Sequence, residues 1–457
     1  SSKTEQYMVF LLDKKNRYTD RNLTADTSVI RFDTEAEMLT MFLAWYNEQK
    51  FTILTGWNST NFDMPYLYRR ICNVLSKEDG DMLSPIGIVK PGYPEDRGRY
   101  KIAGVSQLDY LEMYKKFTYI QQPSYRLDAI GQLEVGMSKV AYDSTIDELY
   151  ENELDKFLEY NIQDVKIVLE LDKKLKLIEL VRSICHMGHV PYEAFEFSSR
   201  FIEGTILTYL HRQNIVCPNK PPYVEKLTKF VGAYVKEPIP GKKNYVICLD
   251  CQSLYPSIIR SLNVSPETLV GEVKDWNVED HMTGKLDKYN LIVNNDARPE
   301  MTRDEFDEYM NKTKLTVAAN GSLYISHIQG VLPKILDDWF EKRREYKALA
   351  KKYLDEGDKE QAEYYDKRQH VQKIFLNSFY GVLGLDSFRF YDLANAKAIT
   401  TSGQTVIKAV AKVVNHILQK GPEVIDRCIY IDTDSIYVSA EDYFGDRFKT
   451  LSDDAKE

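Results

Sequence analysis

The sequence lacks the long apolar stretches of a membrane protein. None of its apolar runs reaches the roughly 18 residues that a membrane-spanning helix requires. Its N-terminal segment has no basic stretch followed by an apolar one, the pattern of a secretory signal peptide. We therefore expect a protein that is neither inserted in a membrane nor secreted.

Cysteine is scarce as well. Six cysteines in 457 residues are too few for a disulfide scaffold, and most lie within apolar stretches, as reduced thiols of a cytosolic protein do. Cys248 and Cys251, and likewise His186 and His189, have metal-like spacing. Structural zinc needs four ligands, however, and neither pair has a second pair in register, so we do not expect zinc.

The sequence also lacks the basic excess that commonly marks a nucleic-acid-binding protein. Its formal net charge is −9, whereas neutralising phosphates requires clustered Lys and Arg. The acidic residues are concentrated between 141 and 172, however, and lysines gather between 219 and 243. The negative net charge therefore does not exclude a nucleic-acid partner. No GxxxxGK[ST] pattern occurs, which argues against a P-loop nucleotide site.

The residue patterns predict several domains of mixed structure. A chain of this length has room for about three domains. The first ~175 residues alternate strand-like and helical segments, which predicts a sheet flanked by helices. We expect strands at 8–12 and 51–57, a helix capped by Asp33, and one long helix over 154–178.

The second half of the chain contains a strand, a helical hairpin and a β-hairpin. Residues 245–250 are strand-like, and Pro333 opens a charged helix that extends to about residue 354. A second helix over 361–383, after a short polar turn, predicts an antiparallel helical hairpin. A further helix over 404–418 precedes two short strands.

Acidic residues in this half have the arrangement that a two-metal site needs. Asp432-Thr433-Asp434 lies between the two short strands, which predicts a hairpin tip with adjacent carboxylates. Such carboxylates, about 3–5 Å apart, repel each other unless a cation lies between them. Asp250 ends an apolar strand and precedes a turn at Tyr255. The two acidic segments predict a two-metal site for phosphoryl transfer, and the alternative is two unrelated surface turns.

The helical hairpin could supply cations to the same chemistry. Arg343, Lys347 and Lys373 are candidates to bind a triphosphate. Asn377 and Tyr380 share the helical face of Lys373, at i+4 and i+7. The alternative is a solvated helix face stabilised by salt bridges.

A second acidic set lies in the N-terminal part. Asp63 lies in a polar turn after the strand at 51–57. Tyr160 and Asp164 are four residues apart and therefore share one helix face. Two carboxylates and a hydroxyl could hold metal ions and a hydrolytic water, and the alternative is a set of solvated surface acids.

Five segments resemble the motifs of family B DNA polymerases. DCQSLYPSII, KIFLNSFYG and YIDTDS resemble polymerase motifs A, B and C, in that family's order. NSTNFD and YNIQD resemble the second and third motifs of the attached 3′→5′ proofreading exonuclease. ILTGWN, QPSYRLD, VKEPIP and VSPET are most similar to the replicative polymerases of T-even-type bacteriophages and their relatives.

This resemblance implies an α/β and α+β multidomain fold. A truncated, ribonuclease H-like exonuclease domain would be followed by a polymerase palm with inserted helical-hairpin fingers. The implied exonuclease domain is 1–176, and 177–221 is a connecting segment that is part of the N-terminal domain. The palm would comprise 222–330 and 386–457, with the fingers at 331–385.

The resemblance also implies residue roles in the polymerase site. Asp250 and Asp434 would ligate two Mg²⁺ ions, with the Cys251 carbonyl assisting and Asp432 alongside. Tyr255 would lie under the deoxyribose and exclude a ribose 2′-OH. The implied nucleotide-binding residues are Cys251, Ser253, Leu254, Tyr255, Arg343, Lys347, Lys373, Asn377 and Tyr380.

Within the nucleotide-binding set, the basic residues Arg343, Lys347 and Lys373 would hold the triphosphate. Asn377 would support that grip, and Tyr380 would monitor the nascent base pair from the minor groove. In the exonuclease, Asp63 and Asp164 would be metal ligands and Tyr160 would position the water. The complete parent would hold two Mg²⁺ ions in that site also.

Three features depart from the family pattern. Motif C usually reads Tyr-Gly-Asp-Thr-Asp, and Ile431 replaces the glycine here. The first exonuclease motif, Asp-x-Glu, is missing upstream. Asp33-Thr34-Glu35 has its residue types but lies too close to Asp63, so we interpret it as a decoy. The rest of the palm and the thumb, which grips the duplex, are also missing, so we expect a fragment.

We expect template-directed DNA synthesis with proofreading, in viral DNA replication in the cytoplasm of an infected bacterial host. The expected partners are primer-template DNA, dNTPs, a sliding clamp, other replisome proteins and, in a split polymerase, a second polypeptide carrying the thumb. One alternative is a nuclease with a vestigial polymerase half, which the intact polymerase motifs disfavour. The other is a nucleotide- or DNA-binding fragment that is inactive alone.

Overall fold

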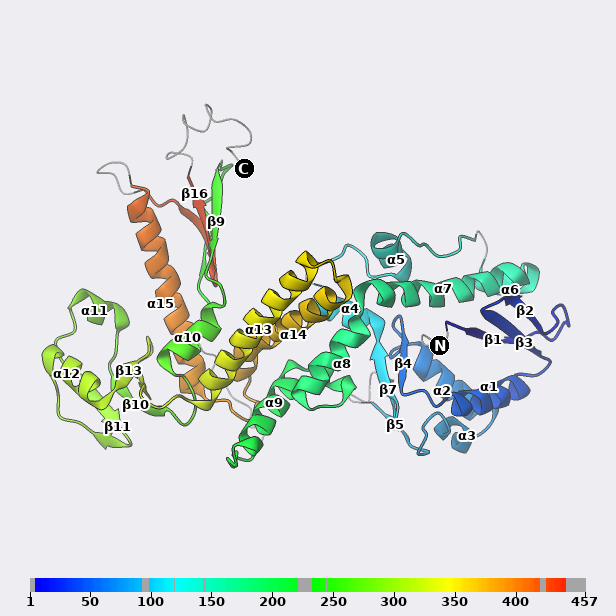
Figure 1. Cartoon of the computed structure of the whole chain (residues 1–457), viewed down its shortest axis with the longest axis horizontal. Coiled ribbons are helices and arrows are strands. Elements are labelled where there is room, and N and C mark those ends of the chain that lie inside the picture. The colour runs from blue at the N-terminus through cyan, green and yellow to red at the C-terminus, as the bar shows by residue number, and fades with distance from the viewer. Residues whose placement is uncertain are drawn as a thin grey trace. The chain divides into compact units, whose positions relative to one another are not determined.

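The chain folds into two compact units, Ser1–Phe201 and Ile202–Glu457 (Figure 1). The computed structural model describes residues 5–92, 98–118, 120–142, 145–220, 232–243, 245–419 and 425–440. The expected boundary at 221–222 and the last part of the expected palm, 441–457, lie outside these described residues. Over the described ranges, no helix has both the length and the apolar character needed to cross a membrane.

The first unit opens with a three-stranded sheet in the order β1-β3-β2. β1 (Tyr7–Leu12) runs parallel to β3 (Thr27–Phe32), and β2 (Arg21–Thr24) runs antiparallel to it. Helix α1 (Glu35–Gln49) contacts β1 and β3. Apolar side chains three or four residues apart form its buried face, as expected for an amphipathic helix: Leu39, Leu43 and Tyr46.

A parallel strand pair in this unit leads into the loop before Asp63. β4 (Ile53–Gly56) pairs with β7 (Ser106–Asp109), so Gly56 and Asp109 end side by side. α2 (Asp63–Val74) follows β4 and α4 (Tyr110–Phe117) follows β7. The other elements are α3 (Lys77–Asp81), β5 (Val89–Pro91), β6 (Tyr100–Ile102), α5 (Leu127–Val135), α6 (Ile146–Asn152), α7 (Leu154–Leu175), α8 (Leu177–Gly188) and the 3₁₀ helix Tyr192–Glu196. Helix α9 (Ser198–Arg212) spans the boundary between the units.

The second unit is built around a four-stranded antiparallel sheet. Its order is β8 (Val235–Lys236), β15 (Cys428–Asp432), β16 (Ser435–Ser439) and β9 (Val246–Asp250). Helix α15 (Leu393–Ile417) covers one face of β15 and β16, and the core between them contains Ile407, Ala411, Cys428, Ile431, Ile436 and Val438. Helix α10 (Leu254–Leu262) follows β9 and contacts α13, α14 and α15.

Two further layers complete the second unit. α13 (Val331–Asp355) and α14 (Lys359–Leu383) form the expected helical hairpin, in which Trp339 packs edge-on against Phe375 and Phe379. A five-stranded sheet carries a separate core around Phe306 and Tyr289. Its elements are β10 (Leu269–Lys274), α11 (Val278–Thr283), β11 (Asn290–Val293), β12 (Asp296–Ala297), α12 (Arg303–Thr313), β13 (Leu315–Val317) and β14 (Ser322–Ile325).

Some expected boundaries were wrong. Thr34, not Asp33, caps α1, because its side chain accepts the Glu37 N–H, while Asp33 forms an ion pair with Arg31. The expected helix over 154–178 is two helices, since Lys176 adopts a positive φ of 53° between α7 and α8. A lysine carries no turn signal, and apolar periodicity continues across the break, which explains the error.

Two other helices begin earlier than expected. α13 begins at Val331 rather than at Pro333, and the Val331 N–H donates to the Glu267 carboxylate (2.5 Å). α15 begins at Leu393 rather than at 404, because the Asp392 side chain accepts the Asn395 N–H. These caps satisfy N–H groups that have no partner within the helix.

Candidate active sites

Strand pairing brings the two acidic segments of the second unit together. β9 and β16 are antiparallel neighbours, with Asp250 opposite Ser435. Asp434 immediately precedes β16, and the Cys251 N–H donates to its carbonyl oxygen (2.7 Å). The reading of Asp250 and Asp434 as two unrelated surface turns is therefore wrong. The hairpin tip itself is tight, and Thr433 adopts a positive φ of 57°.

The charges at this hairpin favour a cation. Partial burial raises the pKa of Asp434, and the negative charges of Asp250 and Asp432 raise it further. A divalent cation would relieve this repulsion, and carboxylate and carbonyl oxygens are ligands that Mg²⁺ prefers. Within the described ranges, no three His, Cys, Asp or Glu side chains group closely enough to hold a metal ion. The hairpin and the neighbouring β9 therefore offer a metal two adjacent carboxylates, those of Asp434 and Asp250.

Ile431 is accommodated where the family's motif C usually has glycine. It lies inside β15, is 2% exposed, and contributes to the core under α15. Its φ is not positive, so the position does not require glycine. The substitution adds apolar contact without distorting the hairpin.

Aromatic residues of the first and second polymerase-like motifs meet beside the carboxylates. Tyr255, in the first turn of α10, lies with its ring centroid 4.1 Å from that of Tyr380 on α14, at an angle of 33°. Burial raises the pKa of Tyr255, and the charges of Asp434 and Asp432 raise it further. The ring therefore lies near the carboxylates. Ser253, which precedes Leu254 at the start of α10, has a positive φ of 56°.

The helical hairpin brings two of the predicted cations near each other. Burial lowers the pKa of His370 on α14, and the cations Lys373 and Arg343 lower it further. Arg343 belongs to α13, so both helices contribute positive charge to this region. Lys347 and Asn377 are exposed. This surface is suited to an anionic ligand.

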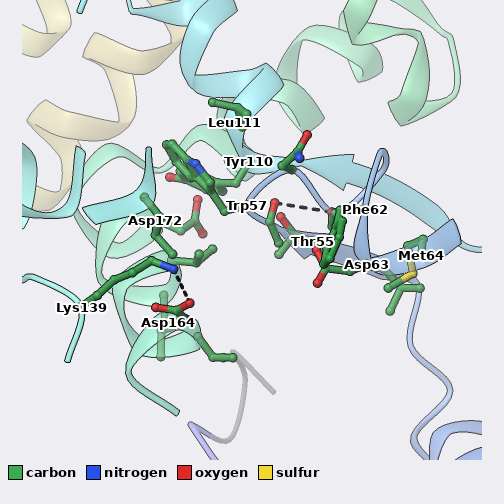
Figure 2. A pocket seen from close by; sticks show the side chains of 18 of the residues that line it. Thr55, Trp57, Phe62, Asp63, Met64, Tyr110, Leu111, Lys139, Asp164 and Asp172 are labelled. Carbon is green, nitrogen blue, oxygen red and sulfur yellow. Dashed lines mark hydrogen bonds and ion pairs between the residues drawn. The ribbon is translucent and has the colours of Figure 1, made fainter. Parts of the chain in front are cut away.

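The first unit contains a cavity of about 1840 Å³. All three residues predicted for the second acidic set, Asp63, Tyr160 and Asp164, line this cavity. Asp63 begins α2, and Asp164 belongs to α7 (Figure 2). Tyr160 lies four residues before Asp164 in the same helix and therefore shares its face. Partial burial raises the pKa of Asp63, and the charges of Asp109 and Asp164 raise it further. Two carboxylates from different helices therefore influence each other across the cavity.

Lys139 is a site residue that the sequence analysis missed. Its Nζ lies 2.6 Å from Asp164 Oδ2 (Figure 2). The same Nζ lies 3.1 Å from the Tyr160 hydroxyl. The other oxygen, Asp164 Oδ1, is buried and has no hydrogen-bond partner. An unsatisfied carboxylate oxygen fits a metal ligand. A lone lysine in a loop has no spacing signal, so only the fold reveals this contact.

Asp33 and Glu35 do not line the cavity. Glu35 forms a bidentate ion pair with Arg70, and Asp33 pairs with Arg31. This agrees with their interpretation as a decoy of the first exonuclease motif.

Asp109 positions the loop that leads to Asp63. Its side chain is 1% exposed and accepts the N–H groups of Asn58, Thr60 and Leu111, each at 3.0 Å. It therefore fixes the segment between β4 and α2 while capping α4. A buried carboxylate of this kind is a structural anchor of the cavity wall.

We expect Asp109→Ala to lower the free energy of unfolding of the first unit by about 3 kcal/mol, because it leaves one buried and two partly buried N–H groups without this acceptor. Urea unfolding followed by circular dichroism measures this. The control is Asp147→Ala, an exposed acid in the first turn of α6, for which we expect a change within about 0.5 kcal/mol. Equal effects of the two substitutions would contradict the anchoring role.

Comparison with known proteins reveals consistent similarities. Residues 194–457 match the family described as DNA polymerase family B, and residues 1–130 match the one described as DNA polymerase family B, exonuclease domain. The chain is 33% identical over 444 residues to the DNA-directed DNA polymerase of Escherichia phage RB69, covering 90% of the chain and 49% of that protein. It is 32% identical over 458 residues to that of Enterobacteria phage T4, covering 92% and 51%.

The chain thus spans about half the length of these curated relatives. Among solved structures, the family B DNA polymerase of the hyperthermophilic archaeon Pyrobaculum calidifontis matches with a TM-score of 0.62 and 23% identity. That match covers 90% of this chain and 49% of the archaeal one, and it confirms the expected mixed α/β multidomain fold.

Proposed function

Because this chain belongs to DNA polymerase family B, we propose that it carries the polymerase active site and part of the proofreading exonuclease of a viral replicative DNA polymerase. The observation that supports this most directly is the pairing of β9 with β16, with Asp250 and Asp434 adjacent and Tyr255 beside them. The proposed substrates are primer-template DNA and dNTPs. The proposed location is the cytoplasm of an infected bacterial host.

In the proposed reaction, the primer 3′-oxygen attacks the α-phosphate of a dNTP. A new P–O bond forms, the bond from the α-phosphorus to the bridging oxygen breaks, and pyrophosphate leaves. Two Mg²⁺ ions held by Asp250, Asp434 and the Cys251 carbonyl would activate the 3′-hydroxyl and neutralise charge on the leaving group. Asp432 adds negative charge at the hairpin tip, which favours cation binding.

The chain's own residues bind and orient the incoming nucleotide in this proposal. Arg343, Lys347 and Lys373 contact the triphosphate oxygens, and Asn377 supports that contact. Ser253 and Leu254 stand at the N-terminus of α10, where free N–H groups suit phosphate oxygens.

Tyr380 and Tyr255 form the aromatic floor of the nucleotide site in this proposal. Tyr380 reads the nascent base pair and Tyr255 contacts the sugar. The same proposal assigns the fingers to 331–385 and the palm to 222–330 and 386–457.

We also propose an exonuclease site in the parent protein, within residues 1–176, with 177–221 as a connecting segment. Asp63 and Asp164 would hold metal ions there, supported by the raised pKa of Asp63 and the unpartnered Asp164 oxygen. Tyr160 orients the attacking water, and Lys139 offers a positive charge to a phosphate. Hydrolysis would form a bond from the water oxygen to phosphorus and break the bond from that phosphorus to the 3′-oxygen of the preceding nucleotide. The 3′-oxygen would take up a proton, and the 3′-terminal nucleotide would leave as its 5′-monophosphate.

The edge of the β9 sheet supports the proposal that further polypeptide completes the enzyme. Val246, Ile247 and Leu249 are 44%, 39% and 41% exposed. A strand with apolar residues on both faces is typical of a buried position. The missing part of the parent, in the same chain or a second polypeptide with the thumb, would cover this edge. Sliding clamp and replisome contacts are proposed for the parent only.

The direct test of the function is template-directed incorporation of one complementary dNTP. We expect the parent polymerase that contains this chain to add the nucleotide with Mg²⁺ and to lose that activity when EDTA removes the metal. Incorporation that is independent of the template would contradict the proposal.

We expect Tyr255→Ala, or Tyr255→Val, to admit ribonucleotides in that polymerase. The ring occupies space that a ribose 2′-OH would need, so discrimination should fall on the order of a hundredfold when the ring is removed. The measurement is the ratio of kcat/KM for a dNTP and its rNTP. Tyr255→Phe is the control, because it keeps the ring. An unchanged ratio in Tyr255→Ala would mean that Tyr255 is a packing residue.

A further inference from the structure

Gly403, a buried residue within α15, lies directly against the ring of Tyr255. A Cβ atom at this position would stand 2.8 Å from Cε1 and 3.4 Å from Cδ1 of the ring. It would also stand 3.5 Å from Cδ1 of Ile258. Two heavy atoms cannot remain 2.8 Å apart without a shift, because van der Waals contact between carbons begins at about 3.5 Å.

The backbone gives no other reason for glycine at this position. Gly403 is helical and its φ is not in the positive range. Glycine within a helix is disfavoured relative to alanine, since it loses more conformational freedom on folding. What the residue provides is space for the edge of the Tyr255 ring.

Helix α14 limits the movement of the Tyr255 ring from another side. The Tyr380 ring lies 4.1 Å from that of Tyr255, so the two rings are already in contact. Tyr255 is therefore confined by α14 on its face and by α15 on the edge that carries Cε1. A methyl group at position 403 would have to displace the ring, and Tyr380 limits where the ring can move.

We propose that Gly403 is a positioning residue that sets the location of the Tyr255 ring and, through it, the selection of deoxyribose over ribose. This rests on the proposed function, in which Tyr255 contacts the sugar. The residue acts through the ring and needs no contact of its own with the nucleotide. Because α15 also covers the sheet that carries Asp434, one helix supports both the carboxylate hairpin and the sugar contact.

The test is a double-mutant cycle in the parent polymerase that contains this chain. We expect Gly403→Ala to raise the KM for a dNTP by about tenfold with a smaller effect on kcat, and to change the dNTP:rNTP ratio at least about threefold. Both effects should persist in a Tyr255→Phe background, where the ring remains. Both should disappear in a Tyr255→Ala background, where nothing is left to displace.

A buried helical glycine in the other unit provides the matched control. A Cβ on Gly131 of α5 would stand 2.7 Å from the Met137 carbonyl oxygen and 2.8 Å from Ile167, so Gly131→Ala introduces a comparable overlap far from Tyr255 in the chain. We expect it to leave the dNTP:rNTP ratio unchanged. An equal change in that ratio with Gly131→Ala would overturn the proposal, since general destabilisation would then explain both variants.

Thermal unfolding of the 457-residue chain gives a second measurement, which also applies if Gly403→Ala folds too poorly for kinetics. We expect Gly403→Ala to lower Tm. In the double variant, Tyr255→Ala should restore part of that loss in Tm. Independent, additive changes in Tm would overturn the contact on which the proposal depends. Equal effects of Gly403→Ala on the ratio with and without the ring would overturn the positioning role while leaving the function of Tyr255 intact. If Tyr255→Ala alone left the dNTP:rNTP ratio unchanged, both the positioning role of Gly403 and the proposed function of Tyr255 would be contradicted.

Discussion

Replacing Asp434 by Asn should abolish primer extension by the parent polymerase while leaving its fold and DNA binding intact. Removal of one charge from a two-metal clamp takes away stabilisation of the charge that develops in the transition state. This is worth about 4 kcal/mol, or roughly a thousandfold in rate. The measurement is single-nucleotide incorporation with saturating primer-template and Mg²⁺.

The structure predicts that this variant remains folded. Partial burial, and then the negative charges of Asp250 and Asp432, disfavour the charged form of Asp434 and raise its pKa. A neutral amide of the same shape relieves that repulsion, so Tm should stay the same or rise slightly. The control is Asp287→Asn, an exposed acid before β11, which should extend primers normally. Extension by Asp434→Asn within about tenfold of the unmodified enzyme would mean that the site has been misplaced.

Asp250→Asn should have the same effect, and the double variant should be little worse than either single one. Groups that act as one unit in catalysis are strongly non-additive. Additive losses would indicate that the two carboxylates serve different steps, contrary to the adjacency of β9 and β16.

The 457-residue chain by itself is expected to be a poor catalyst in both activities, and worse as an exonuclease. Of the acids that line the proposed exonuclease cavity, we assign only Asp63 and Asp164 to the metal. Over the described residues no Asp-x-Glu pair lines the cavity, so we expect Mg²⁺ to be under-coordinated there. The proposed polymerase site keeps its carboxylates and the cations that we propose bind the triphosphate. The chain spans about half the length of its curated relatives, however, so duplex contacts that we propose for the rest of the parent would not be made by this piece. Most of the salt-dependent affinity for the duplex should then be lost.

The experiment is primer extension and 3′-degradation by the purified chain with Mg²⁺, alone and with the missing segments added in cis or in trans. We expect weak dNTP binding and little extension alone, and recovery of extension when the segments are supplied. As a control, the same addition to an Asp434→Asn chain should restore DNA binding but not extension. Strong metal-dependent 3′→5′ digestion by the chain alone would show that other acids, such as Asp33 and Glu35, complete the site. That result would contradict the decoy interpretation.

The β-hairpin and the helical hairpin of the second unit show which features local sequence patterns can predict. The sequence predicted two hairpins: the strands around Asp432 and Asp434, and the antiparallel helices α13 and α14. Both predictions were possible because the spacing of apolar residues, the turn residues and the segment lengths are local properties of the sequence. Their ends were less accurate. α13 begins two residues before Pro333 because Glu267, 64 residues earlier, accepts the Val331 N–H, and no local window contains that partner.

Within the exonuclease-like cavity, the same distinction holds for individual side chains. Tyr160 and Asp164 were predicted to share a face because both belong to one helix, whose geometry fixes their relation. Lys139 was missed, although it lies 2.6 Å from Asp164, since it comes from a loop 25 residues away. Long-range contacts of this kind depend on how α5 and α7 pack, which no spacing rule encodes.

The sequence by itself determined the family, the mixed α/β fold and the identity of the acidic, basic and aromatic candidates. These follow from residue types in fixed order within short segments, whose local geometry is set by the backbone. Only the tertiary structure decided that Asp250 and Asp434 are neighbours, that Ile431 belongs in a buried strand, and that Gly403 leaves room for Tyr255. The physical reason is that strand register and close packing join segments that lie in different parts of the chain. Those contacts are selected by the shape of the whole core rather than by any local propensity.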